Sequence, residues 1–476
     1  MSREDFVETA SPGDGPGGLT PKRVLSYEDC LSARRCASGV SDHGKEALVL
    51  GVGIDWAEEF HLVALGRPGE GVIEVVRVGH NPRAVDALVD KVAALERDPA
   101  QVRVVIETRH GLLVDRLVDA GFVVIPVNPD LISRRRGPAK KKDDAEDARI
   151  ACLLALDRFA GLRPLIPHGP IAAELRAIAR DDERAVRDER RLLNRLRADL
   201  LTVFPAAVTI AGKDMGAPRF LRMLQRWPTA EALGSVSRDE LVAWCRAQRS
   251  GYGERFADRV LAALAAEQFR APAHLVRAKV DTIQLAAAQL LLLGAQRRAW
   301  QRRMSELLLG ATRTPTSGDD HGQEHQPGQA FPGGEIYLSF PGLGARLAAR
   351  IAGEIGDHIE QFSTPNCLQC YAGAAPVTRR SGKRALVVAH RQACNRYLAD
   401  AVPKWAFASL RRSGWAMEFY QAKRACGNSH NAALRALGNR WLEVLWHCLH
   451  KGVRYQEAIH TANRNRALSS QPAPAA

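Results

Sequence analysis

The stretch that most constrains the fold is residues 47–65, with the sequence ALVLGVGIDWAEEFHLVAL. An apolar run over residues 47–54 ends in the carboxylate Asp55, and a second apolar run covers residues 60–65 after a short polar break. Runs of this length predict buried β-strands, and Gly51 and Gly53 let another part of the chain approach closely. A carboxylate that closes a buried strand is costly unless a partner or a cation compensates it, and an ordinary turn aspartate is the alternative.

The following segment continues this pattern with alternating strands and helices. We expect further strands at 72–78, 102–106 and 122–127, and helices at about 83–97, 111–120 and 143–158. The resulting βββαβαβα order predicts an α/β domain with a mixed sheet over residues 47–160.

Four acidic residues fall where these elements would bring them together. Asp55 ends the first strand, Glu107 follows the fourth, and Asp144 and Asp147 lie three residues apart at the start of the last helix. Clustered carboxylates repel each other unless they hold hard cations, and Mg²⁺ prefers oxygen ligands. Two Mg²⁺ ions would activate a nucleophile and stabilise the leaving oxygen in phosphodiester chemistry. For Asp144 and Asp147 alone, helix capping is an equally good explanation.

The charge of the chain points to a polyanionic partner. The formal net charge is +14, which by itself does not separate DNA from RNA or an acidic membrane. The two densest basic segments are expected to bind nucleic-acid backbones through Arg134, Arg135, Arg136, Lys140, Lys141, Lys142, Arg379, Arg380, Lys383 and Arg384. A membrane span is not expected, because no apolar run reaches about 18 residues. Nine scattered cysteines argue for reduced thiols in a cytoplasmic protein.

The middle of the chain, residues 161–310, is predicted to be helical. A long helix should run from Pro272 to about residue 309, and its apolar residues step by four and three, which is coiled-coil spacing. Those residues are Val276, Val280, Ile283, Ala287 and Leu290. Packing within the chain explains the spacing as well as a dimer seam does.

Three segments rich in Gly, Pro, Ser or charge are expected outside the folded parts. We interpret residues 1–46 as a disordered extension, 311–335 as a linker or flexible insert, and 461–476 as a disordered tail.

The remaining segment, residues 336–460, predicts a mainly helical C-terminal domain. Ser381 lies among basic residues in the sequence TRRSGKR. A serine in such a turn is usually a contact to the DNA backbone, and the alternative is a nucleophile that attacks a phosphate. Cys367 and Cys370, with His390 and Cys394 downstream, do not have a standard zinc spacing, so cysteines buried on a helix are the better explanation.

The acids and their neighbouring motifs resemble a known family. The order of strands and acids resembles the RuvC-like branch of the RNase H fold. The K-x-D-x-x-D-A motif at 142–148 is similar to the signature of the DEDD transposases of the insertion-sequence 110 family. The GIDWA and VVIETRHG segments match the same family, and the block from Tyr371 to Arg384 resembles its C-terminal transposase domain. Downstream, Asn395 and Leu398 fit the family pattern, but the glycine before the asparagine and the arginine after the leucine are missing.

The resemblance implies a specific chemistry. It makes Asp55, Glu107, Asp144 and Asp147 the ligands of the Mg²⁺ ions and Ser381 a nucleophile that joins DNA through a phosphoserine. It further implies donor and target DNA as substrates, a bridge RNA that selects them, and a homo-oligomer, a dimer or tetramer, whose subunits share active sites.

Two other functions fit the same sequence. A RuvC-like nuclease would use water as its nucleophile and the C-terminal domain only to bind DNA. A non-catalytic nucleic-acid-binding protein, a decayed copy of a mobile element's product, would bind without cleaving.

Overall fold

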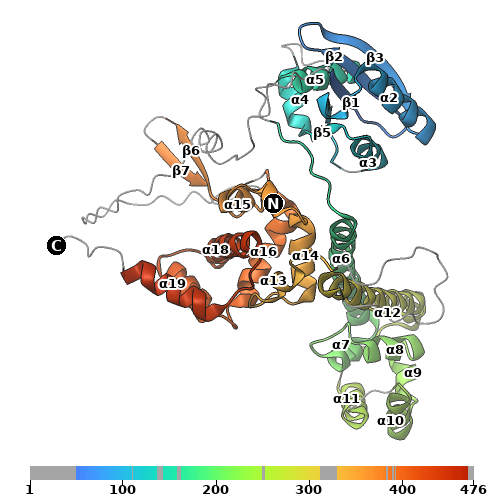
Figure 1. The fold of residues 1–476 in the computed structure, drawn as a ribbon. Coiled ribbons are helices and arrows are strands. Elements are labelled where there is room, and N and C mark those ends of the chain that lie inside the picture. Colours follow the sequence, from blue (N-terminus) through green and yellow to red (C-terminus); the bar gives the residue numbers. More distant parts are fainter. Residues whose placement is uncertain are drawn as a thin grey trace. The chain divides into compact units, whose positions relative to one another are not determined.

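The structure is a computed structural model that describes residues 50–109, 111–136, 143–157, 162–248, 252–267, 269–310, 330–381, 384–388, 391 and 393–469. It divides into two compact units (Figure 1), the first ending at Leu165 and the second beginning at Ile166. Of the expected segments, residues 1–46, most of 311–335, and 470–476 lie outside the described residues.

The first unit contains strands and helices in the order expected from the sequence. In chain order its elements are β1 (Leu50–Asp55), β2 (Phe60–Arg67), β3 (Gly71–Gly79), α2 (Pro82–Leu95), a 3₁₀ turn (Pro99–Gln101), β4 (Val102–Ile106), α3 (Leu112–Asp119), β5 (Val123–Pro126), α4 (Pro129–Arg135) and α5 (Asp144–Leu156). Helix α4 was not expected. Its start carries two sequence signals, because the Asn128 side chain caps the helix and Pro129 is its first residue.

The five strands form one mixed sheet in the order β3-β2-β1-β4-β5. Strand β1 pairs antiparallel with β2, and β2 pairs antiparallel with β3. Strand β1 pairs parallel with β4, in a register that places Ile54 beside Ile106, and β4 pairs parallel with β5. The prediction of an α/β unit with a mixed sheet is therefore confirmed.

The two faces of this sheet are covered by different helices. Leu50, Val52 and Ile54 of β1 pack in one core with residues of α2 and α3. Because side chains alternate along a strand, Gly51 and Gly53 point to the opposite face, where α5 lies. A Cβ atom on Gly53 would lie 2.2 Å from the carbonyl oxygen of Ala148, so the glycine allows α5 to contact the strand backbone.

The second unit is mainly helical, as expected. Its elements are α6 (Pro170–Val203), α7 (Pro205–Ala211), α8 (Pro218–Arg226), α9 (Ala230–Gly234), α10 (Arg238–Ala247), α11 (Gly253–Ala265), α12 (Ala273–Leu309), α13 (Gly334–Leu338), α14 (Ala345–Ile355), a 3₁₀ turn (Ile359–Gln361), α15 (Pro365–Tyr371), β6 (Val377–Ser381), β7 (Arg384–Val388), α16 (Arg396–Ser409), α17 (Gly414–Ala425), α18 (His430–Lys451) and α19 (Glu457–Ser469). Helix α19 extends past residue 460, where the tail was expected to begin.

Helices α6 and α12 form a long antiparallel pair. Three acids of α6 form ion pairs with α12. Glu174 pairs with Arg303, Asp182 with Arg297 and Asp199 with Lys279, so the residue numbers rise along α6 as they fall along α12. One core lies between the end of α6, the start of α12 and helices α7 to α11. Ile283, Ala287 and Leu290 are buried in this core. Their helical spacing thus serves packing within the chain, and a coiled coil between subunits stays a prediction.

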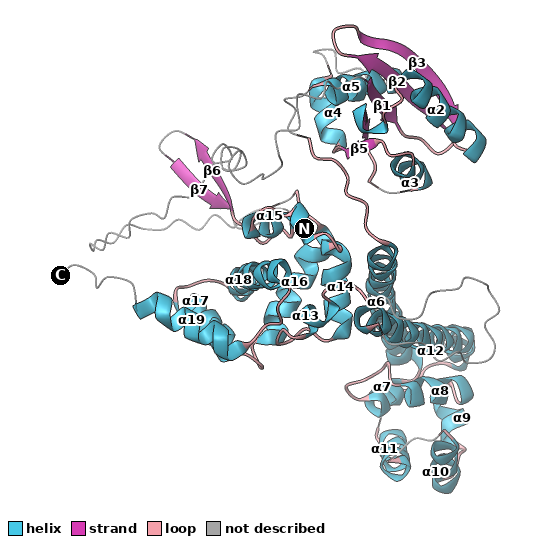
Figure 2. Cartoon of the chain, in the orientation of Figure 1, coloured by secondary structure: helices cyan, strands magenta, loops and turns pink. Residues whose placement is uncertain are grey.

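The other core of this unit joins the start of α6 and the end of α12 to helices α13 to α18. Trp405 and Trp441 are fully buried and stacked at its centre, with ring centroids 5.4 Å apart. Gly342, with a φ of +82°, lets the turn before α14 contact the backbone of Ser409. Strands β6 and β7 add an antiparallel hairpin (Figure 2) that the sequence did not predict. Among the described residues, no helix is both long and apolar enough to cross a membrane.

Candidate metal and nucleic-acid site

Asp55 and Glu107 lie at the carboxyl ends of adjacent parallel strands. Ile54 and Ile106 are register partners, so the next residues, Asp55 and Glu107, lie side by side at the end of the two strands. Side chains alternate between the two faces of a strand, so Asp55 lies on the same face of β1 as Gly51 and Gly53, which face α5. Both carboxylates are half-buried and make further interactions. The two acids thus share one edge of the sheet.

Helix α5 brings Asp147 to the same edge. Its neighbour Ala148 contacts the sheet over Gly53, two residues before Asp55. Asp147 is only 3% exposed. The helix is capped by Asp143, whose Oδ1 accepts a hydrogen bond from the Ala145 backbone N–H at 3.1 Å. Capping, the alternative explanation for the acidic pair, therefore belongs to Asp143 and does not account for the buried carboxylate of Asp147.

Arg136 pairs with this buried carboxylate. Its Nε donates to Oδ1 of Asp147 at 2.7 Å and its Nη2 donates to Oδ2 at 2.5 Å. These hydrogen bonds raise the pKa of the Arg136 guanidinium above its usual value, and the negative charges of Asp147, Glu107 and Asp55 raise it further. One guanidinium therefore lies in the field of three of the four expected acids.

The fourth acid, Asp144, is placed differently. It is the first residue of α5 and is exposed. In the part of the chain that the structure describes, no three His, Cys, Asp or Glu side chains are close enough together to hold a metal ion. Asp55, Glu107 and Asp147 thus lie at one edge of the sheet, where Arg136 is bound to Asp147, and Asp144 is exposed.

Two basic residues of the first segment form ion pairs with acids. Arg134 is exposed, and Arg135 forms an ion pair with Asp157 at 3.4 Å. Arg136 is bound to Asp147 in this structure, and its contact with nucleic acid stays a prediction. Lys140, Lys141 and Lys142 lie outside the described residues.

A histidine pair next to Asp55 was not found from the sequence. The buried His61 accepts a hydrogen bond on Nδ1 from the Ala57 N–H at 3.3 Å, so its Nε2 carries the proton and donates to Nδ1 of His80 at 2.9 Å. Burial, followed by the nearby His80, lowers the pKa of His61. Trp56 stacks on His61 and is 43% exposed. These rings fix the loop that follows Asp55.

Ser381 is the last residue of β6 and the register partner of Arg384 at the turn of the hairpin. Gly382 and Lys383 between them lie outside the described residues. Arg379, Arg380 and Arg384 belong to the same hairpin. The backbone thus presents a serine at the end of a basic hairpin.

The cysteines of this unit have local roles. Cys367 lies on α15, whose N-cap residue Thr364 donates its hydroxyl to Sγ of Cys367 at 3.3 Å. Cys394 donates its thiol to the Arg391 carbonyl at 3.3 Å. His390 lies outside the described residues. Cys367 and Cys370 are half-buried, so the helical placement was right and the burial is partial.

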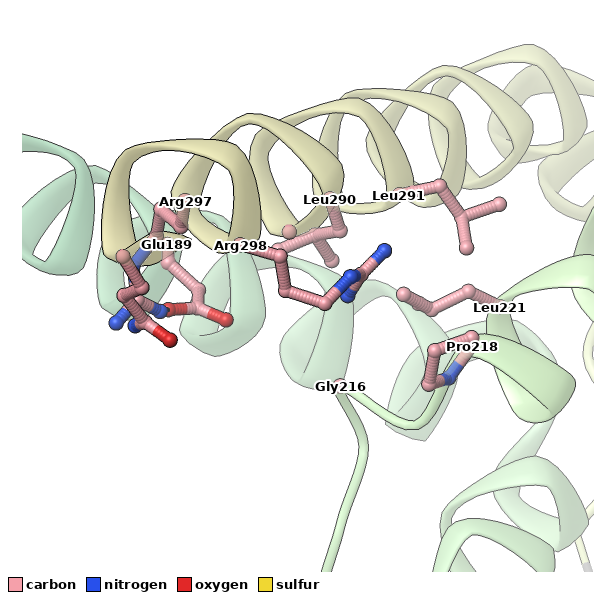
Figure 3. Close-up of a pocket in the computed structure, with 10 residues that line it drawn as sticks. Glu189, Gly216, Pro218, Leu221, Leu290, Leu291, Arg297 and Arg298 are labelled. Carbon is pink, nitrogen blue, oxygen red and sulfur yellow. Dashed lines mark hydrogen bonds and ion pairs between the residues drawn. The ribbon is translucent and has the colours of Figure 1, made fainter. Parts of the chain in front are cut away.

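A hollow between α6, α12 and the start of α8 has a volume of about 160 Å³. Figure 3 shows Arg297 beside Glu189 on one side and Leu221 near Leu291 on the other. Arg297 is already paired with Asp182 and Glu189. None of the predicted site residues lines this hollow, so it is not the candidate site.

Two family models match the chain. The model of DEDD transposases of the IS110 type, described as a transposase, matches residues 52–205. A second model, described as a transposase of the IS116/IS110/IS902 family, matches residues 334–421. Asp55, Glu107, Asp144 and Asp147 lie within the first match and Ser381 within the second.

Several proteins of insertion elements are similar over most of their length. The mini-circle putative transposase for IS117 of Streptomyces coelicolor is 32% identical over 421 residues, which are 87% of this chain and 97% of that protein. The IS116 protein of 44.8 kDa from Streptomyces clavuligerus is 30% identical, over 83% of this chain and 93% of its own. The IS900 protein of 42 kDa from Mycobacterium paratuberculosis is 27% identical, over 81% and 92%. The chain therefore belongs to the IS110 family of DEDD transposases.

Proposed function

We propose that this transposase cuts and rejoins DNA with the hydroxyl of Ser381 as nucleophile, and that the acids of the first unit hold Mg²⁺ beside it. The observation that carries the metal part of the proposal is the placement of Asp55 and Glu107 at the ends of adjacent strands, with the buried Asp147 on α5 at the same edge. The strand order of the mixed sheet, with acids at the ends of β1 and β4, supports a RuvC-like fold for this unit.

The acids suit a hard cation. Asp147 is almost fully buried, so its charge needs a cation for compensation, and Arg136 supplies one in this structure. All donors of the set are carboxylate oxygens, which Mg²⁺ prefers. Asp55, Glu107, Asp144 and Asp147 would hold two such ions. When bound, Mg²⁺ lowers the pKa of a hydroxyl and neutralises charge on a phosphate.

The serine step conserves bond energy. The Ser381 oxygen attacks the phosphorus of a DNA phosphodiester, a new oxygen–phosphorus bond forms, and the bond to one deoxyribose oxygen breaks. The serine proton leaves to a base or water, and the departing oxygen takes one up. The resulting phosphoserine diester can be attacked by a DNA hydroxyl in the reverse sense, so the strands are rejoined without ATP.

The basic segments would bind the nucleic acid. The exposed Arg134 and the basic hairpin around Ser381 would contact phosphates, which makes binding weaken with salt. A bridge RNA that pairs with donor and target DNA is the partner that family membership supports. We propose a homo-oligomer, a dimer or tetramer, in which the acids of one subunit serve the serine of another.

A denaturing gel tests whether Ser381 is the nucleophile. The full-length protein is incubated with its element DNA, bridge RNA and Mg²⁺, and labelled DNA is followed for covalent attachment to protein. Wild type and Ser363→Ala, a control serine in the same unit, should form the adduct, whereas Ser381→Ala and Asp55→Asn should not.

The same gel separates the alternative functions. Cleavage that survives Ser381→Ala without an adduct would favour a nuclease that uses water. Binding by wild type with no cleavage and no adduct would favour a non-catalytic nucleic-acid-binding protein.

A further inference from the structure

Arg136 binds the carboxylate of Asp147, a residue that the proposed function makes a metal ligand. The residue directly follows α4, and its backbone N–H donates to the carbonyl of Ile132 at 3.2 Å. Ile132 is buried against α5 residues such as Ile150, so α4 is fixed to the helix that carries Asp147. The base of the Arg136 side chain is therefore held by the fold, and its guanidinium reaches both oxygens of Asp147.

This pairing opposes metal binding. A guanidinium and a divalent cation on one carboxylate repel each other, and the repulsion is strongest where solvent is partly excluded. Asp147 is 3% exposed and the Arg136 side chain only 17%, so water screens the pair weakly. The negative charges of Asp55 and Glu107, which a metal ion would need, also favour the guanidinium.

Nucleic acid offers Arg136 another partner. A phosphate accepts two parallel hydrogen bonds from a guanidinium, as a carboxylate does, and carries the same charge. Arg136 lies in the basic segment 134–142, beside the exposed Arg134. A phosphate bound beside Arg134 can accept both hydrogen bonds of the Arg136 guanidinium in place of Asp147.

We propose that Arg136 is an internal cation that blocks divalent-ion binding at Asp147, and that nucleic-acid phosphate releases the block. The inference rests on the proposed metal site. It makes metal loading depend on bound nucleic acid, which would keep the acids from promoting cleavage before the substrate is in place.

Calorimetric titration of the full-length protein with Mg²⁺, without nucleic acid, is the first test. If the Arg136–Asp147 pair forms in about nine molecules of ten, it lowers the apparent Mg²⁺ affinity about tenfold. Arg136→Gln should therefore bind Mg²⁺ about tenfold more tightly than wild type. The matched control is Arg149→Gln, which removes the same charge from an exposed residue of α5 paired with Glu146. Its Mg²⁺ affinity should equal that of wild type.

Arg136→Lys guards against misfolding of the glutamine variant. Lysine keeps the charge but loses the two-pronged contact, so its Mg²⁺ affinity should lie above that of wild type. Equal or weaker Mg²⁺ binding by the folded variants would overturn the proposal and leave Arg136 as a positioning residue for Asp147.

The link to nucleic acid is tested by its reciprocal effect. Binding of a short duplex DNA is followed by fluorescence anisotropy with and without Mg²⁺, because linked sites change each other's affinity by the same factor. Adding Mg²⁺ should increase the DNA affinity of wild type and Arg149→Gln more than that of Arg136→Gln. An identical change in all three proteins would overturn the release by phosphate.

Asp55→Asn separates failure of this inference from failure of the proposed function. If Asp55→Asn removes Mg²⁺ binding while Arg136→Gln matches wild type, the metal site stands and the block by Arg136 is wrong. If neither wild type nor Arg136→Gln shows Mg²⁺ binding that depends on Asp55, the proposed metal site itself is wrong.

Discussion

Gly53 lies so close to Cys152 that a Cβ atom on the glycine would be 2.1 Å from the backbone nitrogen of the cysteine. The contact places α5 directly on β1, and the same helix carries Asp147 to the edge of the sheet where Asp55 lies. The distance between Asp55 and Asp147 therefore depends on the absence of a side chain at Gly53.

Gly53→Ala should displace α5 from the sheet. The methyl group would overlap backbone atoms that cannot rotate away, so we expect a loss of about 3 kcal/mol or more in the free energy of unfolding. Urea unfolding of the full-length protein measures this loss. Gly234→Ala is the control, because a Cβ there meets nothing within 4 Å. Equal stability of the two variants would contradict the close approach of α5.

Asp144 and Asp147 should differ in their effect on stability. Asp147→Asn removes the charge that holds Arg136, so the melting temperature should fall in the absence of metal. Asp144→Asn changes an exposed residue and should leave the melting temperature unchanged. Differential scanning fluorimetry in EDTA makes the comparison. A larger loss for Asp144→Asn than for Asp147→Asn would show that the pairing is assigned to the wrong acid.

Asp182 should be among the most sensitive acids of the α6 and α12 pair. It is fully buried and accepts hydrogen bonds from Arg297, at 3.0 Å, and from Arg346. Asp182→Ala leaves two guanidinium groups without this partner and should cost about 3 kcal/mol of stability. Asp188→Ala, which breaks an exposed pair with Arg191 on the same helix, should cost less than about 1 kcal/mol. Chemical denaturation followed by circular dichroism distinguishes these values.

Acid should weaken the first unit through His61. Burial and His80 lower the pKa of His61 in the fold from its ordinary value of 6.5, so the unfolded chain binds a proton that the folded chain does not. The free energy of unfolding is therefore expected to fall as the pH drops below 6.5 and to recover as the pH rises above it.

His61→Gln isolates this contribution. His168 of the second unit, whose pKa burial also lowers, remains in both proteins, so its effect cancels in the comparison. The variant should lose less stability than wild type between pH 7 and pH 5.5, as measured by thermal unfolding of both. A parallel pH dependence of the two proteins would exclude His61 as a source.

The sequence predicted the elements that have strong local signals. The apolar runs of β1 and β2, and Pro272 at the start of α12, mark boundaries that the structure places within a few residues of the expected ones. Helix α4 was not predicted, although Asn128 and Pro129 carry the signals of a helix start. The β6–β7 hairpin was not predicted because β6 contains two adjacent arginines and neither strand alternates apolar and polar residues.

The pairing of Arg136 with Asp147 had no local signal. Arg136 was assigned to nucleic acid from its charged neighbours in the sequence. Its partner in this structure, Asp147, lies eleven positions away and becomes close only when α4 and α5 pack together. His61 and His80 meet for a similar reason, because the register of β2 and β3 places His61 opposite Val78. Contacts of this kind depend on tertiary packing and cannot be derived from composition or periodicity.

The antiparallel pair of α6 and α12 has a consequence for how this family member can change in length. Leu175 and Leu200 belong to different cores and are separated by about 38 Å of continuous helix, at 1.5 Å per residue. The ion pairs between the two helices fix their register along this whole distance. An insertion or deletion in α6 would therefore be tolerated only with a compensating one in α12, so natural length variation here should occur in matched pairs.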